Sequence, residues 1–156
     1  MRLFLLAFAL FAASCATPVA IAVTPERDSV AECLVSAANN DAGRRTCIGA
    51  YAETCINLNE ANQTTGGMVR CFDTERRAWI ALREMQIAAL REQESASQGA
   101  LLTAALEEHE RWAQTRCAYA ASIYEGGSLA RLVLAQCMRD AAAEFTIELL
   151  GRYDEV

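Results

Sequence analysis

Apolar side chains recur along this chain at the three- and four-residue spacing of one face of an α-helix. The pattern predicts helices over residues 25–38, 44–58, 68–94, 100–124 and 129–150. In the last of these, the positions expected to face inward are Val133, Leu134, Cys137, Ala141, Phe145 and Leu149. Many alanines and only two prolines also favour helix over sheet. We therefore expect an all-α fold, a small bundle of antiparallel helical hairpins.

Polar and glycine-containing segments between these helices predict the turns. They cover residues 39–43, 59–67 and 93–99, and Gly126-Gly127 precedes the last helix, for which Ser128 is the expected N-cap. On the third predicted helix, arginines alternate with acidic residues. Glu75 and Arg83 belong to this mixture, which we interpret as a solvated face of mixed charge.

The first residues of the chain are typical of an export signal. Arg2 precedes an apolar run over residues 3–13, and Ala20-Ile21-Ala22 has the small-x-small form of a cleavage site. The run is too short for a transmembrane helix, which needs about 20 residues. We expect residues 1–22 to be a signal peptide and residues 23–156 to form one domain. The alternative is a lipoprotein cleaved before Cys15, and only that route would attach the protein to a membrane.

Six of the seven cysteines lie beyond the expected cleavage site. An even number in a small exported domain predicts a disulfide framework, because export leads to an oxidising compartment. A metal site is the weaker alternative, since the chain has no C-x-x-C motif and a single histidine, His109.

The predicted hairpins select among the possible pairings. Cys47 and Cys55 fall on one predicted helix, where their Cα atoms would lie about 12 Å apart, too far for a disulfide. Antiparallel helices bring together residues at similar distances from their shared turn. The sequence therefore predicts disulfides Cys33–Cys47, Cys55–Cys71 and Cys117–Cys137.

Charge and motifs argue against several classes of function. The formal net charge is −6 and all 14 basic residues are arginine, which is a poor composition for binding nucleic acid and would attract basic partners. His109 is part of no H-E-x-x-H motif, so we interpret it as a packing residue. Core packing is also the expected role of Trp79 and Trp112. We expect no catalytic residue, metal or cofactor, and no enzymatic activity.

The second half of the chain resembles a known family. Trp112, Arg116-Cys117, Gly126-Gly127-Ser128 and Cys137 resemble the end of the LprI-type lysozyme inhibitor domain, found in small helical proteins of the bacterial envelope. Residues 68–71 with Glu75 and Trp79 resemble its first half, so the resemblance covers about residues 53–150. It implies a disulfide between Cys117 and Cys137 and a periplasmic or secreted location.

The resemblance implies an exported binding protein that inhibits lysozyme-type muramidases and so protects the cell wall. The candidate contact residues are those of the last turn, Tyr124, Glu125, Gly126, Gly127 and Ser128. Residues 59–67 are the second candidate. The alternative function is a structural or accessory interaction module of the envelope without a role toward lysozyme.

Overall fold

A computed structural model describes residues 24–152; the expected signal peptide, its cleavage site and Cys15 lie outside the described residues. The described residues are mostly helical and include no strand. Its α-helices are α1 (Pro25–Ser36), α2 (Asp41–Arg45), α3 (Ala50–Asn57), α4 (Thr65–Gln93), α5 (Ala96–Ser122) and α6 (Ser128–Gly151), and a short 3₁₀ helix, η1 (Glu60–Gln63), precedes α4. The all-α prediction is confirmed.

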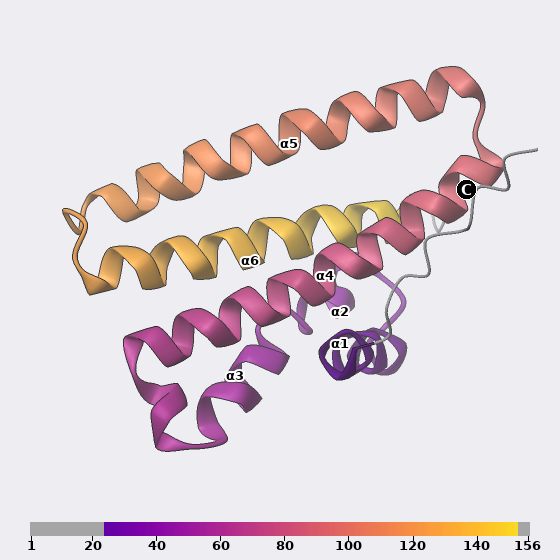
Figure 1. The fold of residues 1–156 in the computed structure, drawn as a ribbon. Coiled ribbons are helices and arrows are strands. Elements are labelled where there is room, and N and C mark those ends of the chain that lie inside the picture. The colour runs from indigo at the N-terminus through magenta and orange to yellow at the C-terminus, as the bar shows by residue number, and fades with distance from the viewer. Residues whose placement is uncertain (1–23, 153–156) are drawn as a thin grey trace, which may run out of the picture.

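Three long helices form the body of the molecule. Helix α6 lies between α4 and α5 and packs against both, whereas α4 and α5 hardly touch each other (Figure 1). Helices α1 and α3 pack on α4, and the short α2 contacts α6. One main core cluster lies where α1, α4 and α6 meet. Its buried members are Val30, Cys47, Ala78, Trp79, Ala142, Ala143 and Ile147.

Side-chain caps explain where most of the helices begin. Thr24, Asn40, Thr64 and Ser95 each accept a hydrogen bond from a backbone N–H in the first turn of the helix that follows. Such a bond satisfies one of the four donors that a helix start leaves unpaired. Helix α6 differs, because its N-cap is Gly127 and no side chain caps it. The predicted N-cap role of Ser128 is therefore wrong; Ser128 is the first residue of α6.

The helix predicted over residues 44–58 is two helices. Asn40 caps α2 before the expected start. Gly49, with a left-handed φ of 95°, then interrupts the predicted helix. Glycine adopts that conformation without the steric penalty that a Cβ would bring. The segment predicted as a turn over residues 39–43 thus already contains the first residues of α2.

All three predicted disulfides are present. The Cα–Cα distances are 5.8 Å for Cys33–Cys47, 5.8 Å for Cys55–Cys71 and 5.5 Å for Cys117–Cys137. The reason for excluding a Cys47–Cys55 pair was partly wrong, because Cys47 lies in the turn between α2 and α3. The pairings hold because each bond joins segments on the two sides of one reversal of the chain. Three disulfides in a domain of this size are typical of an oxidising compartment outside the cytosol.

Among the described residues, no helix combines the length and apolar character needed to cross a membrane.

Candidate interaction surface

The turn between α5 and α6 is a tight reversal built from consecutive backbone hydrogen bonds. The N–H of Tyr124 donates to the Ala121 carbonyl and that of Glu125 to the Ser122 carbonyl, both at 3.1 Å. The N–H of Gly127 donates to the Tyr124 carbonyl at 3.0 Å. These bonds use backbone groups that a helix end leaves unpaired, so the turn has a defined conformation.

Two residues at the tip adopt left-handed backbone conformations. Gly126 has a φ of 75°, and Glu125 has a φ of 49°, the only positive φ at a non-glycine residue in the described chain. A Cβ on Gly126 would meet no atom within 4 Å, so the conformation, rather than a lack of space, explains this glycine. The backbone holds Glu125 at the point where the chain reverses.

The disulfide Cys117–Cys137 joins the two helices behind this tip. Cys117 is fully buried, and Ala113 and Ala121 pack on the same side of α5 toward α6. Small side chains let the two helices approach closely, and the covalent bond restrains their relative position. We expect a hairpin tip that changes shape little on contact with a partner.

A stripe of exposed side chains runs along α5 toward the tip. We call Trp112, Arg116, Tyr119 and Ile123 the α5 stripe; their spacing places them on one side of the helix. Trp112 is 53% exposed, Tyr119 79% and Ile123 72%, and the Arg116 guanidinium lies 5.1 Å from the Trp112 ring centroid. The predicted core role of Trp112 is wrong, because α5 packs chiefly on α6 and only one narrow face is covered.

The tip continues the exposed apolar surface of the α5 stripe and carries a single charged residue. Tyr124 and Leu129, on the two sides of the turn, are 37% and 46% exposed. Between Arg116 and Arg131, Glu125 is the only charged residue. The end of the hairpin therefore presents aromatic and aliphatic side chains around one carboxylate.

His109 is a packing residue, as predicted. Its ring stacks on Phe145 with 4.3 Å between the ring centroids, and its Nε2 lies 3.1 Å from the Ala141 carbonyl oxygen. A carbonyl can only accept, so Nε2 carries the proton. Burial of the ring lowers the pKa of His109, which keeps the imidazole neutral at pH 7.

Glu75 and Arg139 form a buried ion pair that the sequence analysis missed. Glu75 is fully buried, and its Oε2 lies 3.4 Å from a guanidinium nitrogen of Arg139, which is 5% exposed. The same carboxylate accepts hydrogen bonds from the backbone N–H groups of Gly49 and Ala52 at 2.7 Å and from the Trp79 indole at 3.0 Å. Charged side chains this deeply buried are rare unless they are paired.

Glu75 caps the N-terminus of α3, because the N-cap residue of α3 has no side chain that could do so. Gly49 is the N-cap of α3 and has no side chain to accept from the first turn, so the carboxylate of Glu75 on α4 accepts instead. A negative charge is also favourable at the positive end of a helix dipole. The interpretation of Glu75 and Arg83 as part of a solvated face is therefore wrong. Both lie on the buried side of α4.

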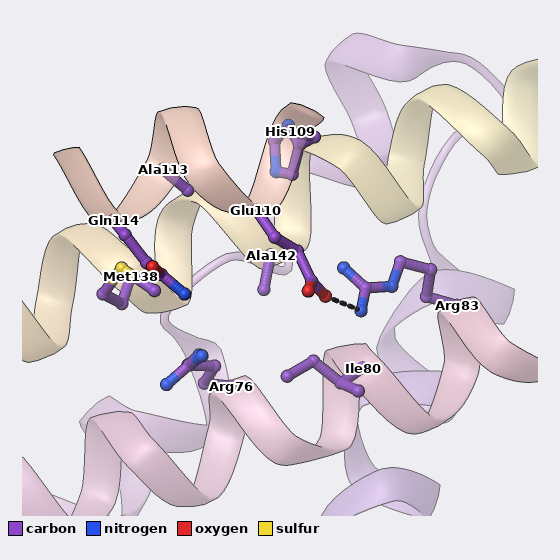
Figure 2. A pocket seen from close by; sticks show the side chains of 9 residues that line it. All are labelled: Arg76, Ile80, Arg83, His109, Glu110, Ala113, Gln114, Met138 and Ala142. Carbon is purple, nitrogen blue, oxygen red and sulfur yellow. Dashed lines mark hydrogen bonds and ion pairs between the residues drawn. The ribbon is translucent and has the colours of Figure 1, made fainter. Parts of the chain in front are cut away.

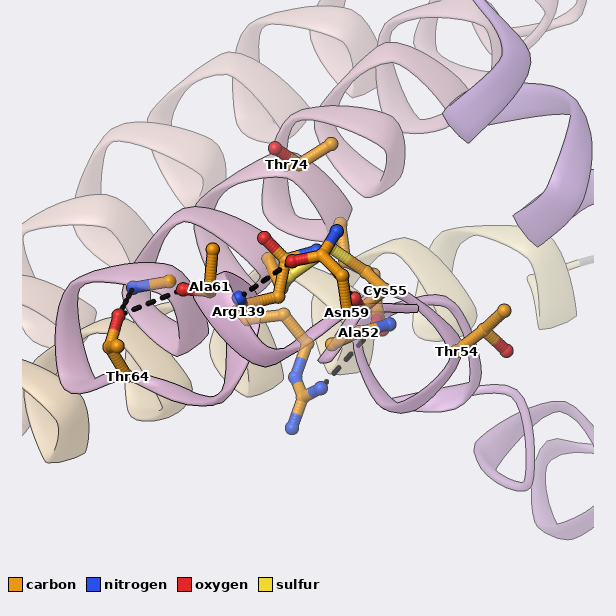
Figure 3. Close-up of a disulfide and its surroundings, with 12 residues drawn as sticks. Ala52, Thr54, Cys55, Asn59, Ala61, Thr64, Thr74 and Arg139 are labelled. Carbon is orange, nitrogen blue, oxygen red and sulfur yellow. Dashed lines mark hydrogen bonds and ion pairs between the residues drawn. A yellow bond between two sulfur atoms is a disulfide. The ribbon is translucent and has the colours of Figure 1, made fainter. Parts of the chain in front are cut away.

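The second candidate segment, residues 59–67, is ordered by its own contacts. It forms η1 and the first turn of α4 rather than an open loop. The Asn62 amide donates to the Cys55 carbonyl at 2.7 Å. The Thr64 hydroxyl donates to the Ala61 carbonyl at 2.9 Å (Figure 3). Its backbone is largely occupied within the molecule, so it offers a partner less than the α5–α6 tip does.

Within residues 24–152, no three His, Cys, Asp or Glu side chains gather as a metal ion would require. Comparison of the chain with protein-family models, with curated proteins and with solved structures gave no match.

Proposed function

We propose that this protein is an exported binding protein that inhibits a lysozyme-type muramidase and so protects the cell wall. One observation carries the proposal: a disulfide-restrained hairpin tip that presents exposed Tyr124 and Leu129 around the carboxylate of Glu125. The resemblance of the second half of the chain to LprI-type inhibitors supports the same function.

Two physical features favour such binding: the charge of this protein is opposite to that of a basic enzyme, and the turn loses little conformational freedom when it binds. Lysozymes are typically basic enzymes, and a chain of net charge −6 attracts them and speeds their encounter. The tip lies at the end of two long helices, where a partner can reach it from several sides (Figure 1). Because backbone hydrogen bonds already define the conformation of the turn, binding would cost little conformational entropy. Exposed tyrosines are frequent anchors of protein interfaces.

An inhibition assay with matched charge variants tests this proposal. The disulfide-bonded protein is titrated against several lysozyme types, and cell-wall lysis is followed by turbidity. Wild type and Glu107→Arg, which changes an exposed carboxylate on α5 far from the tip, should inhibit equally. Glu125→Arg should raise the concentration needed for half-inhibition by about tenfold or more, because it replaces an attraction with a repulsion.

Absence of inhibition at large molar excess, for every lysozyme type tried, would contradict the proposal. So would equal inhibition by the two arginine variants, since the contact would then lie elsewhere on the molecule.

The α5 stripe favours a second candidate function, an accessory subunit of an envelope complex. Trp112, Tyr119 and Ile123 continue the exposed apolar surface along the helix, beyond what a contact at the tip alone would use. A pull-down from envelope extract should then recover one stoichiometric partner with wild type and lose it with Tyr119→Glu. Recovery of no such partner, together with lysozyme inhibition unaffected by Tyr119→Glu, would exclude this alternative.

A further inference from the structure

A second concave surface lies where α4 and α5 both rest on α6. A cavity of about 80 Å³ opens there, lined at its polar end by Arg76, Arg83, Glu110 and Gln114 (Figure 2). Arg76 and Arg83 come from α4, Glu110 and Gln114 from α5, and Met138 and Ala142 of α6 form the floor. A single water needs roughly 10–15 Å³ of such space, so the cavity is large enough for several waters or a small polar group.

Two donors at this cavity have no acceptor. The Nε–H groups of Arg76 and Arg83 are both buried, and no group in the described residues accepts a hydrogen bond from either. Buried polar groups in folded proteins nearly always have a partner, so an unpaired one needs an explanation, such as a bound water, ion or ligand. Two unpaired donors lining one cavity point to a ligand that carries acceptors.

The charges around the cavity do not balance. Arg83 is 4% exposed and donates to Glu110 at 2.9 Å, with Glu84 3.7 Å away on the outer side. Arg76 makes no ion pair or hydrogen bond with any described residue. His109 also lines the cavity, but burial lowers its pKa and leaves it neutral at pH 7. The lining groups therefore carry one uncompensated positive charge.

The cavity continues into a wider apolar groove of about 580 Å³. The two share Arg76, Gln114 and Met138. The apolar lining of the groove is Val69, Ala118, Leu134, Ala135 and Met138, and Asp73 and Arg131 lie at its rim with opposite charges. This corrects the expected inward packing of Leu134, which is 39% exposed in this groove. Small-molecule sites typically combine such a volume and apolar lining with a few polar groups at one end.

We propose that this groove binds an amphiphilic monocarboxylate, a linear hydrocarbon chain ending in a single carboxylate. The carboxylate lies at the Arg76 end and accepts hydrogen bonds from the guanidinium and the Gln114 amide. The hydrocarbon chain covers the floor between Leu134 and Met138. This inference is independent of lysozyme inhibition, which involves another surface, the α5–α6 tip.

The charge of the site selects a monoanion. A single carboxylate neutralises the one uncompensated arginine, whereas a dianion would add repulsion from Glu110, which already holds Arg83. A cationic amphiphile would leave the Arg76 charge unpaired and next to a like charge. An uncharged amphiphile such as an alcohol can accept a hydrogen bond, but it would leave the arginine charge unpaired and form a weaker hydrogen bond than a carboxylate.

Isothermal titration calorimetry with decanoate at pH 7, below its micelle concentration, tests the proposal on the disulfide-bonded protein. Decanoate should bind with one-to-one stoichiometry. Its affinity should exceed that of octanoate by about fivefold or more, because two further methylenes leave water. Decanol and decyltrimethylammonium are the matched ligands without the negative charge, and both should bind at least about tenfold more weakly.

Variants locate the site. Arg76→Gln should weaken decanoate binding about tenfold, the usual effect of losing a hydrogen bond to a charged group. Arg77→Gln is its control, because Arg77 is the adjacent exposed arginine of α4, does not line the groove and donates instead to Thr74. Leu134→Glu, which places a negative charge in the groove, should abolish binding. Circular dichroism checks that each variant keeps its helices.

Several outcomes would overturn the proposal. Acetate binding as tightly as decanoate would indicate an adventitious anion only. Equal losses in Arg76→Gln and Arg77→Gln would indicate attraction to net charge. Absence of decanoate binding to wild type, or equal binding of decanol, would remove the site altogether.

Discussion

At the scale of single residues, Glu75 shows how a carboxylate can be buried when all its surroundings donate to it. Its two oxygens accept two backbone N–H groups of the α3 start, the Trp79 indole N–H and an Arg139 guanidinium N–H. A spacing signal for its burial exists in the sequence. Cys71, Glu75 and Trp79 follow each other at four-residue steps on one side of α4, between buried neighbours. Charge alone led to the opposite interpretation.

Replacing this carboxylate should destabilise the protein strongly. We expect Glu75→Gln to lower the free energy of unfolding by about 3 kcal/mol, since Arg139 would be left buried without its counter-charge and an amide nitrogen cannot accept from the Ala52 N–H. Denaturation by urea at neutral pH measures the loss. Glu92→Gln, which removes the same charge from an exposed position of α4, is the control and should change stability little. A loss below that caused by ordinary surface substitutions would contradict the role given to Glu75.

At the scale of elements, glycines decide where helices stop and how closely segments approach. Gly49 separates α2 from α3, and a Cβ at this position would also lie 3.1 Å from an Arg139 guanidinium nitrogen. Gly67, in the first turn of α4, is buried against η1. A Cβ there would overlap the Ala61 carbonyl oxygen and the Asn62 backbone. The contact is between backbones, so flexible side chains cannot relieve it.

The neighbouring glycines of α4 provide a matched test of this packing. Gly67→Ala should lower the free energy of unfolding by about 1–3 kcal/mol, because η1 or the helix start must shift. Gly66→Ala should be neutral or stabilising by up to about 1 kcal/mol, because its side has open space and alanine favours helix. Thermal and urea unfolding of both variants measure the difference. Equal effects of the two substitutions would show that η1 does not restrict position 67.

At the scale of the whole molecule, the packing is uneven. Helix α4 has neighbours on several sides, whereas α5 packs chiefly on α6 and keeps most of its side chains in solvent. Its buried residues are Ala113, Cys117 and Ala121, which bury little apolar area, and the partly buried Leu102 and Leu106 add contacts with a core cluster of α4 and α6. The disulfide Cys117–Cys137 therefore adds a covalent restraint at the end of α5 where the packing is sparse.

Removal of the Cys117–Cys137 disulfide should increase the local opening of α5 without affecting the rest of the fold. In a variant with both Cys117 and Cys137 changed to alanine, we expect amide hydrogens of α5 to exchange faster, while those of the central part of α4 stay protected. Hydrogen exchange followed by mass spectrometry resolves the two helices. The control variant lacks Cys33 and Cys47 instead, and should loosen α1 without affecting α5. Equally faster amide exchange in α4 and α5 would contradict this prediction, because it would mean that the molecule opens only as a unit.

The sequence by itself determined the helical class, the number of long helices and the pairing of six cysteines. Those features follow from local periodicity and from the position of turns such as Gly126-Gly127, both of which depend on residues close in the chain. Sequence reasoning also placed Trp79 in the core and His109 in a packing role, and both are confirmed.

Only the tertiary structure decided which side of each helix is covered, because that depends on how many neighbours the helix has. Trp112 is exposed since nothing covers that side of α5, and Glu75 is buried since α3 begins above it. The groove beside Arg76 exists because α4 and α5 both pack on α6 and have few direct contacts with each other. Spacing along one helix can indicate a buried side, but it does not identify the neighbours that cover the helix, because these are set by contacts between residues far apart in the chain.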